Sequence, residues 1–196
     1  MVGERPRVEL VKVGILPPGM GRALARRLAS AAPWEVTLAD GPIEPRPAFE
    51  AIRQQYSADV LLSHLLESPP VPGLRRLGVT HVDLFVPVFT HLFGYGMLAG
   101  RAALVSIFRL RPEFGGDAPD SDLLLDRVTK EALHELGHTF GLVHCPAPWC
   151  AMKASSSPEE VDLKDAAYCP SCLRIVEEGG VPREGQSPPC PPRSAG

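Results

Sequence analysis

Apolar and polar positions follow two different periods along the chain, and these periods predict strands and helices in alternation. Residues 7–16 and 34–40 alternate and are rich in Val and Leu, which is typical of strands, whereas the Ala, Leu and Arg content of 19–32 suits a helix. Further segments fit the same two classes: a helix over 57–67, and strands over 79–89 and 102–110. Because strands and helices alternate, the sequence predicts an α/β or α+β fold in which helices cover a sheet.

The clearest helix is expected over 121–140. Asp120 or Ser121 can cap its amino end, and acidic residues lie near its start. Its apolar positions recur mostly three or four residues apart, so one face packs inward. These positions are Leu125, Val128, Ala132, Leu133 and Leu136. Residues 179–196 contain five prolines and almost nothing apolar to bury, so they are expected to form a disordered tail.

Composition and charge narrow the class of protein. The chain has 196 residues, 44% of them hydrophobic, which is enough for one core and favours a single domain. A formal net charge of −3 leaves no basic surplus for nucleic acid or anionic lipid. No apolar run approaches the roughly 20 residues that span a bilayer, and the first ten residues lack the features of a secretory signal. We expect a cytoplasmic, monomeric protein that binds neither nucleic acid nor membranes.

The candidate chemistry lies in the sequence HELGHTFGLVHC at 134–145. His134 and His138 are four residues apart, so on a helix their side chains lie on one face and can reach a single metal ion. Glu135 lies about 100° round the helix from His134, which places it beside such an ion rather than on it. That position suits a carboxylate that takes a proton from a water molecule.

His144 can reach the same ion only if the helix ends before it. In a continued helix, His144 would lie roughly 9 Å beyond His138 and about 120° round the axis. Gly141 falls where the break is required, and glycine accepts the left-handed conformation that ends helices. We therefore predict that the helix ends at Gly141 and that His144 turns back as a third ligand.

Three neutral imidazoles leave the fourth position of a tetrahedral zinc ion open to water, as in catalytic sites. Such a water can have its pKa lowered to about 7, and Glu135 could accept its proton and pass it to a departing amine. This chemistry is hydrolysis of a peptide or amide bond. A bare HExxH also arises by chance, but the added glycine and third histidine make a chance match far rarer. The remaining histidines lack any such pattern and are assigned to structure or surface: His64, His81 and His91.

The cysteines follow the last histidine directly. Cys145 and Cys150 form C-x4-C, and after 18 intervening residues Cys169 and Cys172 form C-x2-C, close to the spacing of a closed zinc site with four thiolates. Two disulfides or four free buried thiols are the alternatives, and the absence of a secretion signal favours zinc. Cys190 lies in the tail as an unused thiol. We therefore predict two zinc ions per chain, one catalytic and one structural.

A single peptide bond joins His144 to Cys145, so a closed cysteine site would fix the direction of the third histidine. Met152 follows Cys150 by two residues. It is either a core residue or a methionine turn beneath the catalytic zinc, and neither role is chemical.

The motif HELGHTFGLVH with a nearby methionine resembles the metzincin metallopeptidases, and the C-x4-C-x-M and C-x-x-C that follow narrow the resemblance to the archaemetzincin family. Residues 79–89 and 91–110 are also similar to that family's central region. The resemblance implies a twisted mixed sheet above the active-site helix and a small zinc-bound C-terminal subdomain below it. It also implies an edge strand, here within 91–106, that lines the cleft and pairs with an extended peptide. Sixteen residues separate Met152 from Cys169, about one fewer than in the family pattern, a difference that a loop absorbs.

These inferences divide the chain into a catalytic N-terminal part with the active-site helix (1–144), a C-terminal part with the four-cysteine zinc site (145–178) and the tail (179–196). The leading hypothesis is a zinc metallopeptidase that acts on peptides with Glu135 as general base. The resemblance implies aminopeptidase-like cleavage, as in eukaryotic relatives. The alternative is a zinc-stabilised peptide-binding protein with little or no turnover, but binding alone needs no base at position 135.

Overall fold

The larger of two β-sheets forms the centre of the molecule. The computed structural model describes residues 5–180. The strands of this sheet run in the order β2 (Glu35–Leu38), β1 (Arg7–Val13), β5 (Leu74–Thr80), β9 (Ala102–Ser106) and β8 (Gly94–Gly96). The first four are parallel, and β8 pairs antiparallel with β9 at the edge. Because inner parallel strands are covered on both faces, every residue of β9 is buried.

One face of this sheet is covered by a helix and a smaller sheet. The smaller sheet has the strand order β3 (Phe49–Glu50), β4 (Gln55–Ser57), β6 (Leu84–Val86) and β7 (Phe89–Leu92). The helix α2 (Ala58–Leu66) buries Leu61, Leu62 and Leu65 against residues of β1 and β9. Together these elements form one of the two hydrophobic clusters of the described chain.

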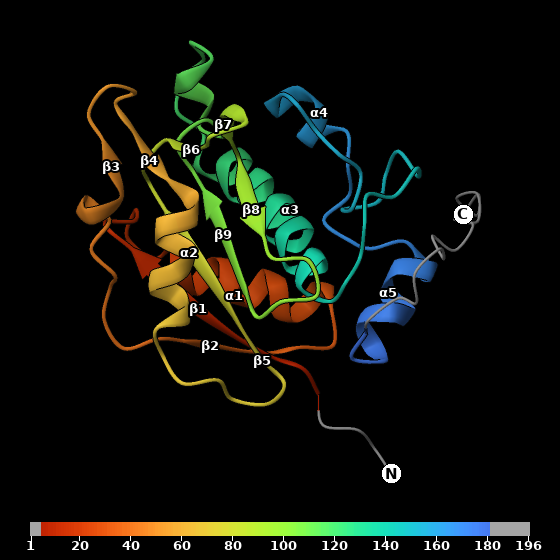
Figure 1. Ribbon diagram of the computed structural model, residues 1–196. Coiled ribbons are helices and arrows are strands. Elements are labelled where there is room, and N and C mark those ends of the chain that lie inside the picture. Colours follow the sequence, from red (N-terminus) through yellow and green to blue (C-terminus); the bar gives the residue numbers. More distant parts are fainter. Residues whose placement is uncertain (1–4, 181–196) are drawn as a thin grey trace.

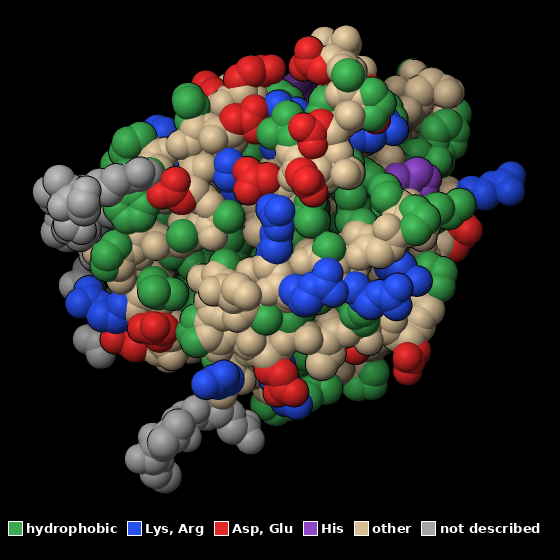
Figure 2. Space-filling view, turned by 180° about the vertical axis from the view of Figure 1, so that it is seen from behind, with side chains coloured by type: hydrophobic (Ala, Val, Ile, Leu, Met, Phe, Trp, Pro, Cys, Tyr) green, Lys and Arg blue, Asp and Glu red, His purple; other side chains and the backbone are tan. Residues whose placement is uncertain are grey.

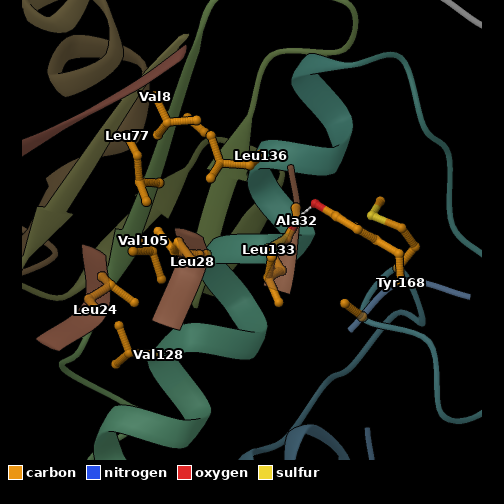
Figure 3. Packing of buried hydrophobic residues seen from close by; sticks show 14 of the residues in the cluster. Val8, Leu24, Leu28, Ala32, Leu77, Val105, Val128, Leu133, Leu136 and Tyr168 are labelled. Atoms are coloured by element: carbon orange, nitrogen blue, oxygen red, sulfur yellow. Dashed lines mark hydrogen bonds between the residues drawn. The ribbon is translucent and has the colours of Figure 1, made fainter. Parts of the chain in front are cut away.

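The helices α1 (Met20–Ala31) and α3 (Ser121–Thr139) cover the opposite face, as can be followed in Figure 1. Figure 3 shows their side chains meeting those of the sheet. Val8, Leu77 and Val105 come from the strands β1, β5 and β9. Leu24 and Leu28 come from α1, and Val128, Leu133 and Leu136 come from α3. The apolar face expected for α3 is thus directed into the core, which fixes the orientation of the helix that carries the histidines.

The C-terminal segment packs against α3 and contains α4 (Pro158–Asp162) and α5 (Pro170–Glu177). Arg127 of α3 forms an ion pair with Asp162 at 2.7 Å, and the Tyr168 hydroxyl donates a hydrogen bond to the backbone oxygen of Leu133. Residues of this segment share one hydrophobic cluster with the sheet. The division of the chain at 144/145 therefore stays a prediction, and the expected tail lies, from residue 181 onward, outside the described residues.

Most of the expected elements are confirmed with shorter bounds: β1, α1, β2, α2, β9 and α3. The single strand expected over 79–89 is wrong, because β5 ends at Thr80 and β6 begins at Leu84. Asp83 lies in the turn between them and accepts hydrogen bonds at 2.6 and 2.7 Å from Arg109, which stabilise the turn. Some elements are too short to show a period of apolar residues in the sequence. They are the strands β3, β4, β7 and β8 and the 3₁₀ turns η1 (Arg46–Ala48) and η2 (Pro112–Phe114).

The outer surface carries charges of both signs. On the face seen in Figure 2, acidic side chains gather in the upper half of the view and basic ones across its middle, with hydrophobic side chains between them. Among the described residues, no helix has the length and apolar character needed to cross a membrane.

The amino end of α3 is capped as the sequence predicts. The Asp120 carboxylate accepts hydrogen bonds from the backbone N–H groups of Asp122 and Leu123 at 3.0 and 2.9 Å. We expect Asp120→Ala to lower the free energy of unfolding by about 0.5–2 kcal/mol, because these N–H groups lose their partner. Thermal unfolding measures the effect. Asp117→Ala, which removes the same charge three residues earlier, is the control, and equal losses in both variants would contradict the cap.

Candidate metal centres and active site

Two histidines of α3 face each other across one helical turn. The Nε2 atoms of His134 and His138 are 3.1 Å apart, and their ring centroids are 4.7 Å apart. This follows from the helix geometry, which places residues i and i+4 on one face. His134 is buried and His138 is partly buried, so the pair lies at the inner end of an opening rather than on the outer surface.

The helix ends where the sequence requires. Gly141 has a φ of +84°, and α3 stops at Thr139. The Gly141 N–H donates to the His138 carbonyl at 2.9 Å and the Leu142 N–H to the Gly137 carbonyl at 3.1 Å, the two hydrogen bonds of a Schellman motif. The reversed chain brings the His144 ring within 5.2 Å of His134 and 5.3 Å of His138, measured between centroids. The predicted break at Gly141 is confirmed.

The hydrogen bonds of the rings fit a bound metal ion. His134 Nδ1 lies 2.9 Å from the Ala151 carbonyl oxygen, and His138 Nδ1 lies 2.8 Å from the Leu142 carbonyl oxygen. A carbonyl only accepts, so both Nδ1 atoms carry the hydrogen and both Nε2 atoms keep a lone pair. Burial lowers the pKa of both rings, which favours their neutral form. The two Nε2 lone pairs face each other at 3.1 Å with no hydrogen between them, so they repel each other. A cation bound to both nitrogens removes this repulsion.

One nitrogen of each of the three rings lies within 4.8 Å of the others. Three imidazoles with room for another ligand suit zinc better than calcium or magnesium, which prefer oxygen ligands. The residues present therefore fit the zinc ion that the sequence predicts.

Glu135 lies between α3 and the edge strand β8 and lines the same pocket as the histidines. It is buried, and burial raises the pKa of its carboxyl well above the ordinary value, with the neighbouring Glu131 carboxylate adding to the rise. The backbone N–H of Gly96 donates a hydrogen bond to this carboxylate and opposes the rise. The three-histidine group does not include Glu135, and its place beside an ion stays a prediction.

The four cysteines form a second cluster. Their Sγ atoms all lie within 4.8 Å of one another, and Cys145 and Cys169 are 3.9 Å apart. A zinc–sulfur bond of about 2.3 Å implies about 3.8 Å between two sulfurs of a tetrahedral site, whereas a disulfide needs about 2.05 Å. All four are free cysteines, and a hydrogen bond from the Cys172 thiol lowers the pKa of Cys150 to about 5, toward the thiolate that binds metal. Cys190 lies outside the described residues.

The two clusters are joined by short connections. The Cys145 N–H donates to the Met152 carbonyl at 2.9 Å, and the Ala151 carbonyl next to Met152 faces His134. Met152 is fully buried, and its Sδ occupies the space that a side chain at Gly137 would need. Met152 is therefore a core residue packed against α3 between the two histidines, and the methionine turn beneath a zinc ion stays a prediction.

A pocket of about 640 Å³ opens over the histidines. Strands β7 and β8 form one wall, and residues 154–156 form part of another. His91, assigned from the sequence to structure or surface, is partly exposed and lies on the β7 wall of the pocket. His64 and His81 have other contacts: His64 lies 4.0 Å from Glu67, and His81 accepts a hydrogen bond from the Ile15 N–H at 3.3 Å.

Sequence reasoning also missed a buried ion pair beside the pocket. Lys164 Nζ donates to Glu131 at 2.6 Å and to the Lys153 carbonyl at 3.1 Å, and both partners of the pair are buried. Burial raises the pKa of Glu131, and the Lys164 ammonium opposes the rise. Glu131 lines the pocket one helical turn before Glu135, so helical spacing was the available signal for it.

Comparisons with known proteins agree with this geometry. The model of peptidase family M54 matches residues 46–178, a range that includes both clusters. The archaemetzincin of Methanocaldococcus jannaschii is 42% identical over 137 residues, which cover 70% of this chain and 74% of that protein. The crystal structure of archaemetzincin from Methanopyrus kandleri has a TM-score of 0.77 and 34% identity, covering 90% of this chain and 96% of that chain. The crystal structure of a zinc-dependent peptidase from Methanocorpusculum labreanum has a TM-score of 0.78 and 30% identity, and the match covers 87% of this chain and 99% of that chain. These structures confirm the fold class expected from the sequence.

Proposed function

The chain belongs to peptidase family M54, and we propose that it hydrolyses peptide bonds in the pocket above His134, His138 and His144, with Glu135 as general base. The observation that carries the proposal is the convergence of three imidazoles beside a buried carboxylate in one pocket. A pocket that only binds peptides has no need of a desolvated carboxylate at that place.

The three imidazoles would hold zinc, and the four thiolates would hold a second, structural zinc. Zinc at the histidines would supply polarisation of the peptide carbonyl and would lower the pKa of a water molecule toward neutrality. The protein's own carbonyl groups at Ala151 and Leu142 hold the rings in the required tautomer.

Glu135 would take up the proton of the attacking water at a carboxylate oxygen and return it to the nitrogen of the departing amine. Its burial supports this role, because a carboxylate that is poorly solvated accepts a proton more readily than one in water. The surrounding walls exclude bulk water from the carboxylate, and the adjoining pocket keeps it in reach of a substrate.

The substrate would be an extended peptide that lies along β8. This strand is at the open edge of the sheet and within the range expected for a cleft-lining strand. In an antiparallel pair, alternate residues direct their backbone groups away from the partner strand. Phe93 and Met97 bond to β9, so Gly94 and Gly96 direct their backbone groups to the open side. The Gly96 N–H is taken by Glu135, which leaves the Gly94 groups and the Gly96 carbonyl to pair with a peptide as a further strand.

The resemblance to archaemetzincins further supports an aminopeptidase-like mode, and this is part of the proposal. Paired peptides with free and acetylated amino termini test it. Faster cleavage of the free form at the first peptide bond is expected, and equal cleavage of both forms at internal bonds would contradict the aminopeptidase mode alone.

Metal removal tests the zinc part of the proposal. We expect two zinc ions per purified chain by elemental analysis. Prolonged treatment with a strong chelator should abolish cleavage of a mixture of fluorescence-quenched peptides, because the histidine site is the more open of the two. Added zinc should restore the activity. Full activity in protein that measurably lacks metal would contradict the proposal, and a two-zinc protein that cleaves no peptide would favour a binding module.

A further inference from the structure

Strand β8 consists of Gly94, Tyr95 and Gly96, and its two faces differ sharply. Tyr95 packs against the hydrophobic cluster around α2, and its side chain forms a hydrogen bond with Asp59 at the start of that helix. The two glycines face α3 on the other side. Just beyond the strand, the Ala99 N–H donates to the His138 carbonyl at 2.8 Å. The strand is therefore held in place by contacts that do not involve Glu135.

The space that a side chain at Gly94 would occupy is filled by Glu135. A Cβ atom at Gly94 would lie 2.5 Å from the Cγ of Glu135, 2.7 Å from its Oε1 and 2.8 Å from its Cδ. These distances are far shorter than the 3.5–4.0 Å of favourable contacts between heavy atoms. Gly94 does not have a positive φ, so the position requires the absence of a side chain rather than the conformational freedom of glycine.

Gly96 approaches a different part of the same residue. A Cβ atom at Gly96 would collide with the backbone oxygen of Glu135, and it would lie 3.0 Å from both the Oε2 of Glu135 and the Cβ of His138. The N–H of Gly96 is on the open side of the strand and donates a hydrogen bond to the Glu135 carboxylate. Gly94 thus contacts the side chain of Glu135, whereas Gly96 contacts the backbone of α3 and donates a hydrogen bond to the Glu135 carboxylate.

We propose that Gly94 and Gly96 are positioning residues that hold the Glu135 carboxylate in one orientation toward the pocket. A free glutamate side chain samples several rotamers, and contact along Cγ, Cδ and Oε1 excludes those that need the space of the strand. The Gly96 N–H then selects the direction of the carboxylate oxygens. The role in catalysis rests on the proposed function of Glu135, whereas the contact itself can be tested without substrate.

A double-mutant cycle on unfolding tests the contact. Gly94→Ala is expected to lower the Tm by roughly 2–12 °C, the range for overpacking in a chain of this size. In a Glu135→Ala background, the three atoms that meet the new Cβ are gone, so Gly94→Ala should lower the Tm by less than a third as much. Gly96→Ala is the matched contrast. Its shortest contact is with the backbone oxygen of residue 135, which remains in both backgrounds, so most of its loss of Tm should remain in the Glu135→Ala background.

Zinc content is measured for every variant so that Tm values are compared at equal metal occupancy. An equal loss of Tm from Gly94→Ala in both backgrounds would overturn the proposed contact. The double-mutant cycle uses no substrate. A wild-type protein that cleaves no peptide would contradict the proposed function, whereas the contact between Gly94 and Glu135 would still be tested by the Tm values.

Kinetics on the same peptide mixture separates positioning from simple packing. Gly94→Ala is expected to lower kcat about 10²-fold with KM changed by less than about threefold, because a displaced base impairs chemistry more than binding. Gly21→Ala is the control, since a Cβ there meets Leu10 and Leu38 at 3.9 and 4.0 Å, which are ordinary contacts. A folded, zinc-loaded Gly94→Ala variant with the kcat of the wild type would overturn the positioning role.

Discussion

Glu135→Gln is expected to lower the rate of peptide hydrolysis by roughly 10²–10⁴ while leaving the fold and both zinc ions in place. Glutamine has the same shape, so it fills the space beside Gly94, and its amide oxygen can still accept the hydrogen bond from Gly96. It cannot accept and return a proton in the pH range where peptidases act. The variant therefore removes the chemistry proposed for Glu135 and retains its packing.

Initial rates on the peptide mixture and elemental analysis of zinc measure the two halves of this expectation. Glu67→Gln is the matched control, because its side chain is 75% exposed at the end of α2 and does not line the pocket. If Glu135→Gln kept the activity of the wild type at full zinc content, another group would have to move the proton. If it lost zinc as well as activity, the loss of rate would not report on the base.

The parts of the site that the sequence predicts are those that depend on local geometry. His134 and His138 follow from the helical period, and the return of His144 follows from a glycine at the C′ position of a Schellman motif. The cysteine cluster follows from spacing because knuckles of this kind close over a few residues. The histidines and the members of each cysteine pair are close in sequence, whereas the meeting of the two cysteine pairs follows from the spacing typical of four-thiolate zinc sites.

The parts that the sequence does not predict depend on contacts between distant segments. Gly94 and Gly96 are 39 or more residues away from Glu135, and a three-residue strand leaves no period that would place them against α3. Lys164 meets Glu131 only because the C-terminal segment folds back onto the same helix. The turn at Asp83, which divides the strand expected over 79–89, is likewise set by Arg109, 26 residues later. Hydrophobic pattern alone carries no information on such pairs.

The buried pair of Glu131 and Lys164 shows how the C-terminal segment is tied to the active site. Lys164 bonds both to the helix that carries the histidines and to the Lys153 carbonyl, one residue after Met152. A buried charge pair contributes little net stability, but it strongly disfavours arrangements that separate the charges. The pocket wall at 154–156 therefore has a fixed place relative to α3.

Cys169→Ser is expected to weaken zinc binding at the histidines as well as at the cysteines. The Cys169 N–H donates to the Cys150 sulfur at 3.3 Å, and the Ala151 N–H donates to the Ala167 carbonyl at 2.9 Å. The segment that holds Cys169 thus fixes the segment around Ala151, whose carbonyl orients His134. Serine is a poor zinc ligand, so the variant should lose the structural ion and loosen these connections.

The expected loss at the histidine site is roughly 10- to 100-fold in zinc affinity, the range for loss of a group that orients a metal ligand. His144 adds to the effect, since the peptide bond to Cys145 passes any movement of the cysteine cluster directly to the third ring. Competition with a chromophoric chelator resolves the two sites, and the histidine site is identified as the one weakened by His138→Ala. Cys190→Ser, the same chemical change outside the described residues, should leave both affinities unchanged. Wild-type affinity at the histidines in a Cys169→Ser protein that has lost its structural ion would show that the two centres are independent.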